Sequence, residues 1–110
     1  MSYIPSKGDI VWVEFNPQKG HKQKGHRPAV VISPYEYNLK TSLAIVMPIT
    51  SKIKGYPFEV PVRGEHIKGV ALADQVKSLD FKARNFSFIE KADSVVLVEI
   101  LYKLKVLLSI

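Results

Sequence analysis

Before residue 90, the apolar residues of the chain fall in short runs that mostly alternate with polar positions at the two-residue period of β-strands. Glycine, proline and asparagine interrupt these runs, as turns between strands require. The pattern predicts strands at residues 9–15, 27–33, 42–49, 58–62 and 69–73, a continuation of the last strand to residue 77, and an edge strand at residues 86–89. A single helical turn is predicted at residues 35–40.

After residue 92 the apolar period changes to that of a helix. Asp93 or Ser94 can cap the first turn of this helix. The predicted apolar face consists of Leu97, Ile100, Leu101, Leu104, Leu107 and Leu108. An amphipathic helix of about four turns would close one side of the sheet.

The chain has 110 residues, which suits one core and a single domain spanning residues 1–110. Many short strands and one terminal helix predict a mainly β fold: a strongly bent small barrel with a short helix and a C-terminal helix. Val95, Val96, Val98 and Val106 make the terminal helix apolar on more than one side. Either the barrel alone or a second copy of the chain would supply the additional cover.

The charge balance narrows the class of partner. The formal net charge is +6, which favours a polyanion such as nucleic acid or an acidic protein segment. Cysteine is absent, which excludes disulfides, thiolate catalysis and cysteine zinc sites. The N-terminus lacks a hydrophobic signal core and the chain has no membrane-length apolar run, so we expect a cytoplasmic protein.

Positive charge is concentrated before the second predicted strand. Lys19, Lys22, Lys24 and Arg27 fall within nine positions, with His21 and His26 among them. Pro28 biases Arg27 away from helical backbone, and the β-branched run that follows anchors the end of this loop in a sheet. A guanidinium held in this way suits a phosphodiester, because its planar fork matches phosphate geometry.

Three routes to RNA cleavage can be compared with these residues. The carboxylates are scattered without a close pair, which argues against a metal nuclease, and no metal or other cofactor is expected. Histidines could transfer protons, but His21 and His26 lie on the loop whereas His66 is distant in sequence. In the third route the ribose 2′-hydroxyl attacks its own phosphate, and the protein aligns the attack and stabilises the phosphorane. Arg27 suits that role, with Thr50 or Ser51 as a hydroxyl donor.

For several residues the pattern leaves a structural and a functional interpretation open. Thr50 and Ser51 are typical of a strand end with turn-forming hydroxyls, and the pattern alone favours this structural interpretation. Trp12 could stack on a base but belongs more naturally to the core. Gln75 could contact a base edge or simply face water.

Five segments in order resemble the MazF/PemK family of bacterial toxins, which are the endoribonuclease halves of toxin–antitoxin pairs. These segments are residues 7–13 (KGDIVWV), 25–31 (GHRPAVV), 48–51 (PITS), 54–60 (KGYPFEV) and 69–78 (GVALADQVKS). The resemblance covers nearly the whole chain. It implies an SH3-like barrel of the CcdB/PemK type, assembled as a homodimer.

The resemblance also implies an activity and the residues that perform it. The activity is metal-independent, sequence-specific cleavage of single-stranded mRNA, giving 2′,3′-cyclic phosphate and 5′-hydroxyl ends. The family's catalytic arginine and threonine fall on Arg27 and Thr50, so the resemblance decides for the functional interpretation of Thr50. The residues expected to contact RNA are Lys22, Lys24, His26, Ser51, Gln75 and Lys77.

The implied partner is an acidic antitoxin peptide of the MazE type, which would compete with RNA for one basic surface. Many relatives carry a glutamate in the loop where this chain has Lys22, so a mechanism that uses that glutamate as a base does not transfer. The alternative functions are a gyrase-poisoning toxin of the same fold, whose key residues lie in the terminal helix, and a plain SH3-like binding module. The presence of Arg27 and Thr50 favours the nuclease.

Overall fold

The computed structural model describes residues 3–14 and 26–109, and these form a mainly β fold, as predicted. The strands are β1 (Asp9–Glu14), β2 (His26–Val31), β3 (Leu43–Thr50), β4 (Glu59–Arg63), β5 (Lys68–Leu72), β6 (Lys77–Asp80) and β7 (Ser87–Lys91). The helices are α1 (Tyr35–Thr41) and α2 (Ser94–Leu108), with a 3-10 turn η1 (Ala73–Gln75). None of the helices in this part of the chain is long and apolar enough to cross a membrane.

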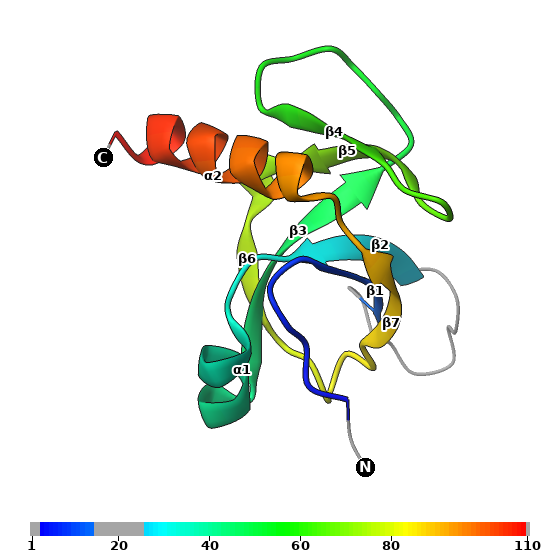
Figure 1. The fold of residues 1–110 in the computed structure, drawn as a ribbon, viewed down its shortest axis with the longest axis vertical. Coiled ribbons are helices and arrows are strands. Elements are labelled where there is room, and N and C mark those ends of the chain that lie inside the picture. The colour runs from blue at the N-terminus through cyan, green and yellow to red at the C-terminus, as the bar shows by residue number, and fades with distance from the viewer. Residues whose placement is uncertain (1–2, 15–25, 110) are drawn as a thin grey trace.

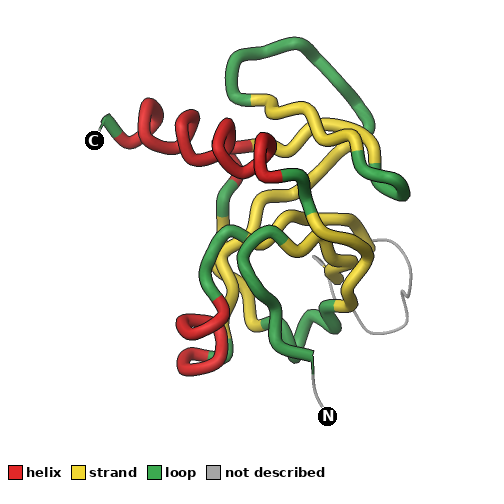
Figure 2. The backbone as a smooth tube through the Cα atoms, viewed as in Figure 1, coloured by secondary structure: helices red, strands yellow, loops and turns green. Residues whose placement is uncertain are grey.

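The strands form one antiparallel sheet in the order β4-β5-β3-β2-β1-β7, and β6 pairs with β3 beside this path. Figure 1 shows β4 and β5 in an upper layer and β1, β2 and β7 in a lower one, with β3 running between them. The predicted edge strand is β7, which pairs only with β1 among the described strands. The secondary structure along the whole path is easiest to follow in Figure 2.

β3 is the strand that joins the two layers. It was predicted to end at Ile49, but it continues through Pro48 to Thr50. On the edge of β3 that faces away from β2, residues 43–46 pair with β6, whereas Ile49 and Thr50 pair with β5. Pro48 lies where the partner changes, so its missing N–H interrupts neither of these ladders.

The predicted continuous strand from residue 69 to residue 77 is wrong. The chain forms β5, turns through η1, and enters β6 against a different part of β3. The backbone N–H of Ala73 donates to the carbonyl of Phe58, the residue before β4, at 3.0 Å. This hydrogen bond holds the start of the turn against the start of β4. A local sequence pattern cannot show that two adjacent short strands pair with different neighbours.

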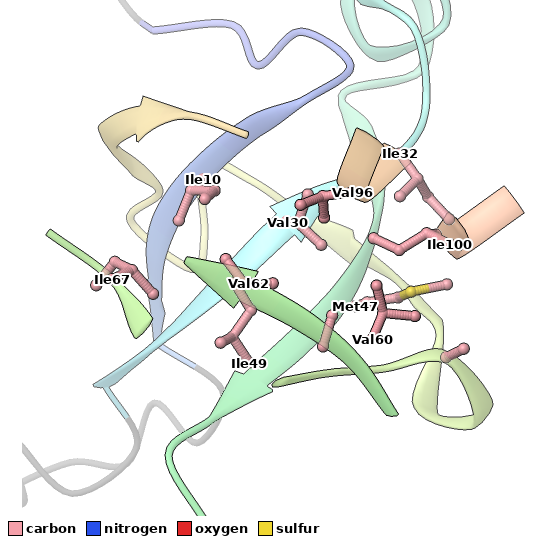
Figure 3. Close-up of a cluster of buried hydrophobic side chains, with 12 residues drawn as sticks. Ile10, Val30, Ile32, Met47, Ile49, Val60, Val62, Ile67, Val96 and Ile100 are labelled. Carbon is pink, nitrogen blue, oxygen red and sulfur yellow. The ribbon is translucent and has the colours of Figure 1, made fainter. Parts of the chain in front are cut away.

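Apolar side chains pack on both faces of the sheet, as the alternating pattern of β1 predicts. Ile10 belongs to one buried cluster, while Val11 and Val13 belong to the other. Figure 3 shows the first cluster, in which side chains of β1, β2, β3, β4 and α2 converge with Ile67 from the β4–β5 turn. Trp12 packs against this cluster, which agrees with its interpretation as a core residue.

α2 begins after Asp93, as predicted, but the Asp93 side chain forms no capping hydrogen bond, and the predicted buried face is only partly correct. The fully buried positions are Val96 and Ile100, while Leu101 and Leu108 expose 44% and 60% of their surface. In Figure 1 the first turns of α2 lie over the sheet and the remainder extends beyond it. Leu97 and Leu104 pack against the core cluster, so the covered face of α2 extends to Leu104, while Leu101 lies outside this face and Leu108 lies beyond it.

Candidate nucleic-acid interface

An open pocket of about 400 Å³ lies where β2, β3 and the β4–β5 turn meet. It is lined by Arg27, Pro28, Ile49, Thr50, Ser51, Lys52, His66, Ile67 and Lys68. Three of these residues are cationic and none is a carboxylate. Among the described residues, this lining is cationic and therefore suits an anionic ligand.

Sheet register brings Arg27 and Thr50 together. Ala29 pairs with Pro48 in the antiparallel ladder between β2 and β3. The same register continued by two residues places Arg27 opposite Thr50, and strand alternation puts both side chains on one face. Arg27 is exposed and Thr50 is half-buried, so both are accessible to a ligand from the same side.

The Arg27 guanidinium is available for a ligand. Arg27 forms no ion pair with a described residue, and the ion pair of Lys91 Nζ with Asp9 Oδ1, at 2.7 Å, lies elsewhere. Asp9 lies at the start of β1, whereas Arg27 faces Val13 near the other end of that strand. An arginine without a carboxylate partner keeps its donors free to bind phosphate.

The Thr50 hydroxyl is oriented by the turn that follows β3. The backbone N–H of Lys52 donates to Thr50 Oγ1 at 3.1 Å. This bond uses the hydroxyl oxygen as an acceptor and leaves its hydrogen free to donate elsewhere. The structural interpretation of Thr50 as a turn former is therefore correct, and it is compatible with a role as a donor toward the pocket.

The turn between β4 and β5 is held by one carboxylate from β7. Glu90 Oε1 accepts from the N–H of Glu65 at 2.9 Å, and Oε2 accepts from His66 at 3.0 Å and Ile67 at 2.8 Å. The Ile67 side chain points into the core, so its neighbours His66 and Lys68, both exposed, are turned outward to the pocket.

These contacts keep Glu90 ionised. Partial burial of the carboxylate raises its pKa, but the three backbone N–H donors, helped by the charge of His66, lower the pKa more, and the net shift is downward. A depressed pKa contributes stability above the ordinary pKa of glutamate, and this contribution is lost as pH falls through the folded-state value.

Glu90→Gln should loosen this turn. An amide offers one acceptor oxygen in place of two, so at least one backbone N–H loses its partner, at a cost of about 0.5–1.5 kcal/mol in the free energy of unfolding. Urea unfolding at pH 7 measures the loss, and the difference between parent and variant should shrink as pH falls through the lowered pKa of Glu90. Glu65→Gln, in the same turn, is the control. An equal loss in the control would contradict the assigned role of Glu90.

The long loop after β3 is fixed at several points. The buried carboxylate of Glu59 accepts from the N–H groups of Lys54 at 2.8 Å and Gly55 at 2.9 Å. The Tyr56 hydroxyl donates to Asp74 Oδ1 at 3.0 Å, and this hydrogen bond raises the pKa of Tyr56. Lys103 Nζ from α2 donates to the carbonyl of Pro57. These contacts anchor the segment that carries Lys52.

Other residues predicted from the sequence lie in different places. Ser51 lines the pocket beside Thr50. Gln75 lies in η1 and Lys77 pairs with Val46, four residues along β3 from Thr50, so neither reaches the pocket itself. His26 packs its ring 4.9 Å from that of Trp12. Lys22 and Lys24 lie outside the described residues.

Sequence reasoning missed three members of the pocket lining: Lys52, His66 and Lys68. His66 is distant in sequence from Arg27, which was the reason for setting it aside, but the pairing of β5 with β3 brings its turn to Thr50. The strands predicted at residues 58–62 and 69–73 indicate that His66 lies in the turn between them, but not what that turn contacts. Nothing in the local pattern indicated that β5 would pair with the end of β3.

Comparison with known proteins gives consistent matches. Residues 6–108 match the model of the PemK-like, MazF-like toxins of type II toxin–antitoxin systems. The chain is 56% identical over 82 residues to the endoribonuclease toxin MazF of Escherichia coli K12, covering 74% of each chain. It is 31% identical over 108 residues to the endoribonuclease PemK of Escherichia coli, covering 94% of this chain and 81% of PemK.

Solved structures agree with the sequence relatives. A crystal structure of MazF from Deinococcus radiodurans superposes with a TM-score of 0.89 at 44% identity, covering 99% of this chain and 100% of that one. A MazE–MazF crystal structure from the same organism gives a TM-score of 0.88 at 40% identity, covering 99% of each chain. With the fold, the family model and these relatives in agreement, the chain belongs to the family of PemK-like, MazF-like toxins of type II toxin–antitoxin systems.

Proposed function

We propose that this MazF-like toxin is a sequence-specific endoribonuclease that cleaves single-stranded mRNA without a metal ion. The observation that carries the proposal is the pocket in which Arg27 and Thr50 lie together with two lysines and no carboxylate. The relatives named above as endoribonucleases support an RNA-cleaving activity for the family. A cationic pocket is suited to hold a scissile phosphate and to stabilise the charge that develops on it.

In the proposed reaction, the ribose 2′-oxygen attacks the adjacent phosphorus and the bond to the 5′-oxygen breaks. The products are a 2′,3′-cyclic phosphate and a 5′-hydroxyl. The Arg27 guanidinium donates two hydrogen bonds to the phosphorane oxygens, and the Thr50 hydroxyl donates a third. Alignment of the attacking oxygen with the leaving oxygen adds to this stabilisation.

RNA would extend from this pocket over neighbouring basic and polar groups. Ser51, Lys52 and Lys68 flank the scissile phosphate, since they line the same pocket. Lys22, Lys24 and His26 would contact RNA on the side of the loop that precedes β2. Lys77 pairs with Val46, which lies about 13 Å from Thr50 along β3 at the rise of a strand, and Gln75 lies in the preceding turn η1. Both would contact RNA beyond the cleaved bond.

Two partners are proposed, each for a different surface. An acidic antitoxin segment of the MazE type would bind the cationic pocket and exclude RNA. A homodimer would cover the apolar side of α2, where Val95 and Val98 each expose 69% and Tyr102 exposes 64% of their surface. We place this activity in the cytoplasm, where the mRNA substrate is translated.

Incubation of the purified protein with mixed single-stranded RNA in excess EDTA tests the proposal. Cleavage should persist, and the upstream products should resist phosphatase until acid opens a cyclic phosphate. Intact RNA accompanied by growth arrest on expression would favour the gyrase-poisoning alternative. Intact RNA with normal growth would favour a binding module.

A further inference from the structure

His66 is chemically distinct from the other polar residues that line the pocket. Arginine and lysine side chains stay protonated near neutral pH, and serine and threonine hydroxyls do not gain protons there. Histidine is the side chain whose protonation state changes between pH 5 and 8. Among the described residues of the lining, His66 is therefore the one suited to accept a proton from a ribose hydroxyl.

The position of His66 is set by contacts on both sides of it. Its backbone N–H donates to Glu90 Oε2 at 3.0 Å, and the following residue, Ile67, is 9% exposed and inserted in the core. The turn is thereby fixed at two adjacent positions, while the imidazole remains exposed toward the pocket. A catalytic group needs this kind of support, because small displacements of a proton acceptor are costly.

The charged groups near His66 come from the elements that line the pocket and from those that hold its turn. Arg27 from β2, Lys52 from the loop after β3 and Lys68 from β5 are cationic. Glu90 from β7 carries the opposing negative charge, and Glu65 is adjacent in the turn. Glu90 contacts the backbone N–H of His66 and not its ring, so it holds the position of the residue, and its negative charge lies near the imidazolium that forms during reaction.

We propose that His66 is the general base of the cleavage reaction and that Glu90 is its positioning residue. This inference rests on the proposed function of the pocket. A neutral ring nitrogen of His66 takes the proton of the 2′-hydroxyl while the bond from the 2′-oxygen to phosphorus forms. The bond from phosphorus to the 5′-oxygen breaks, and the departing oxygen takes a proton from water. The imidazolium then returns its proton to solvent, so the protein is unchanged.

The pH dependence of kcat/KM for an oligonucleotide that the parent protein cleaves tests this assignment. The parent should lose activity as pH falls through the range in which imidazole side chains gain a proton. His66→Gln and His66→Ala should lower kcat/KM at pH 7.5 by about 10²–10⁴-fold and should remove this acid limb. Added imidazole should restore part of the activity of His66→Ala. Glu65→Gln should keep both the rate and the acid limb.

A substrate with sulfur in place of the bridging 5′-oxygen separates the two roles that a histidine can play. A thiolate leaves without a proton, so loss of a general base still slows cleavage of this substrate. Recovery of the His66→Ala rate to that of the parent would assign His66 to the leaving group and overturn the proposal, as would an unchanged acid limb in His66→Gln. Thermal unfolding of each variant confirms folding. A parent protein that leaves RNA intact would instead refute the proposed function.

Discussion

Arg27→Ala should lower kcat/KM for RNA cleavage by at least a hundredfold while leaving the fold intact. The substitution removes the donors that stabilise negative charge on the phosphorane, and loss of one such donor costs about 2.7–4 kcal/mol of transition-state stabilisation. Arg27 is exposed, and it forms no ion pair with a described residue, so its removal should hardly change the free energy of unfolding. Single-turnover cleavage and urea unfolding measure the two quantities separately.

Arg27→Lys distinguishes geometry from charge. Lysine keeps the positive charge but offers a point charge in place of a planar fork, so activity should stay well below that of the parent. Near-parental activity in Arg27→Lys would show that electrostatic attraction alone is required. Parental activity in Arg27→Ala would end the assignment of Arg27.

Gly69→Ala should damage both the fold and the pocket. A Cβ on Gly69 would lie 2.3 Å from the carbonyl oxygen of Thr50, and a backbone atom cannot move aside as a flexible side chain can. We expect a loss of about 1–3 kcal/mol in the free energy of unfolding. Because Thr50 pairs with Val70, separation of β5 from β3 also shifts the hydroxyl, and activity should fall at least tenfold.

Gly55→Ala is the matched control for this effect. Gly55 has φ +86°, which is strained for alanine, and its added Cβ would meet nothing within 4 Å. This variant should lose stability but keep its activity under conditions in which it remains folded. Equal loss of activity in both variants would mean that stability, and not the approach of β5 to Thr50, limits the reaction.

Local features of the fold could be predicted from the sequence, whereas contacts between distant residues could not. The alternation of β1 correctly predicted a strand with two apolar faces, and Pro28 correctly marked Arg27 as extended backbone. The resemblance directed attention to Arg27 and Thr50, which line one pocket. Their catalytic roles stay predictions.

The contacts of His66 and Glu90 could not be predicted, because they depend on which strands become neighbours. The turn that carries His66 reaches the pocket only because β5 pairs with the last two residues of β3. Glu90 lies on β7, and β7 and β4 are at the two ends of the strand order. The Glu90 side chain nevertheless contacts the turn between β4 and β5. Both contacts join residues more than fifteen positions apart, and periodicity contains no information about such pairings.

The exposed leucines of α2 show a second limit. Their helical spacing is real, but spacing indicates which face is apolar and not what covers it. In the single chain the helix packs against the core as far as Leu104, while Val95, Val98, Leu101 and Leu108 stay exposed.

A double-mutant cycle on kcat/KM tests the central claim most directly, namely that Arg27 and Thr50 act on one phosphate. Arg27→Ala, Thr50→Ala and the double variant are compared with the parent on the same RNA. Residues that stabilise one transition state as a unit are strongly non-additive. The double variant should therefore be little slower than the slower single variant, whereas full additivity of the two losses would contradict a shared catalytic pocket.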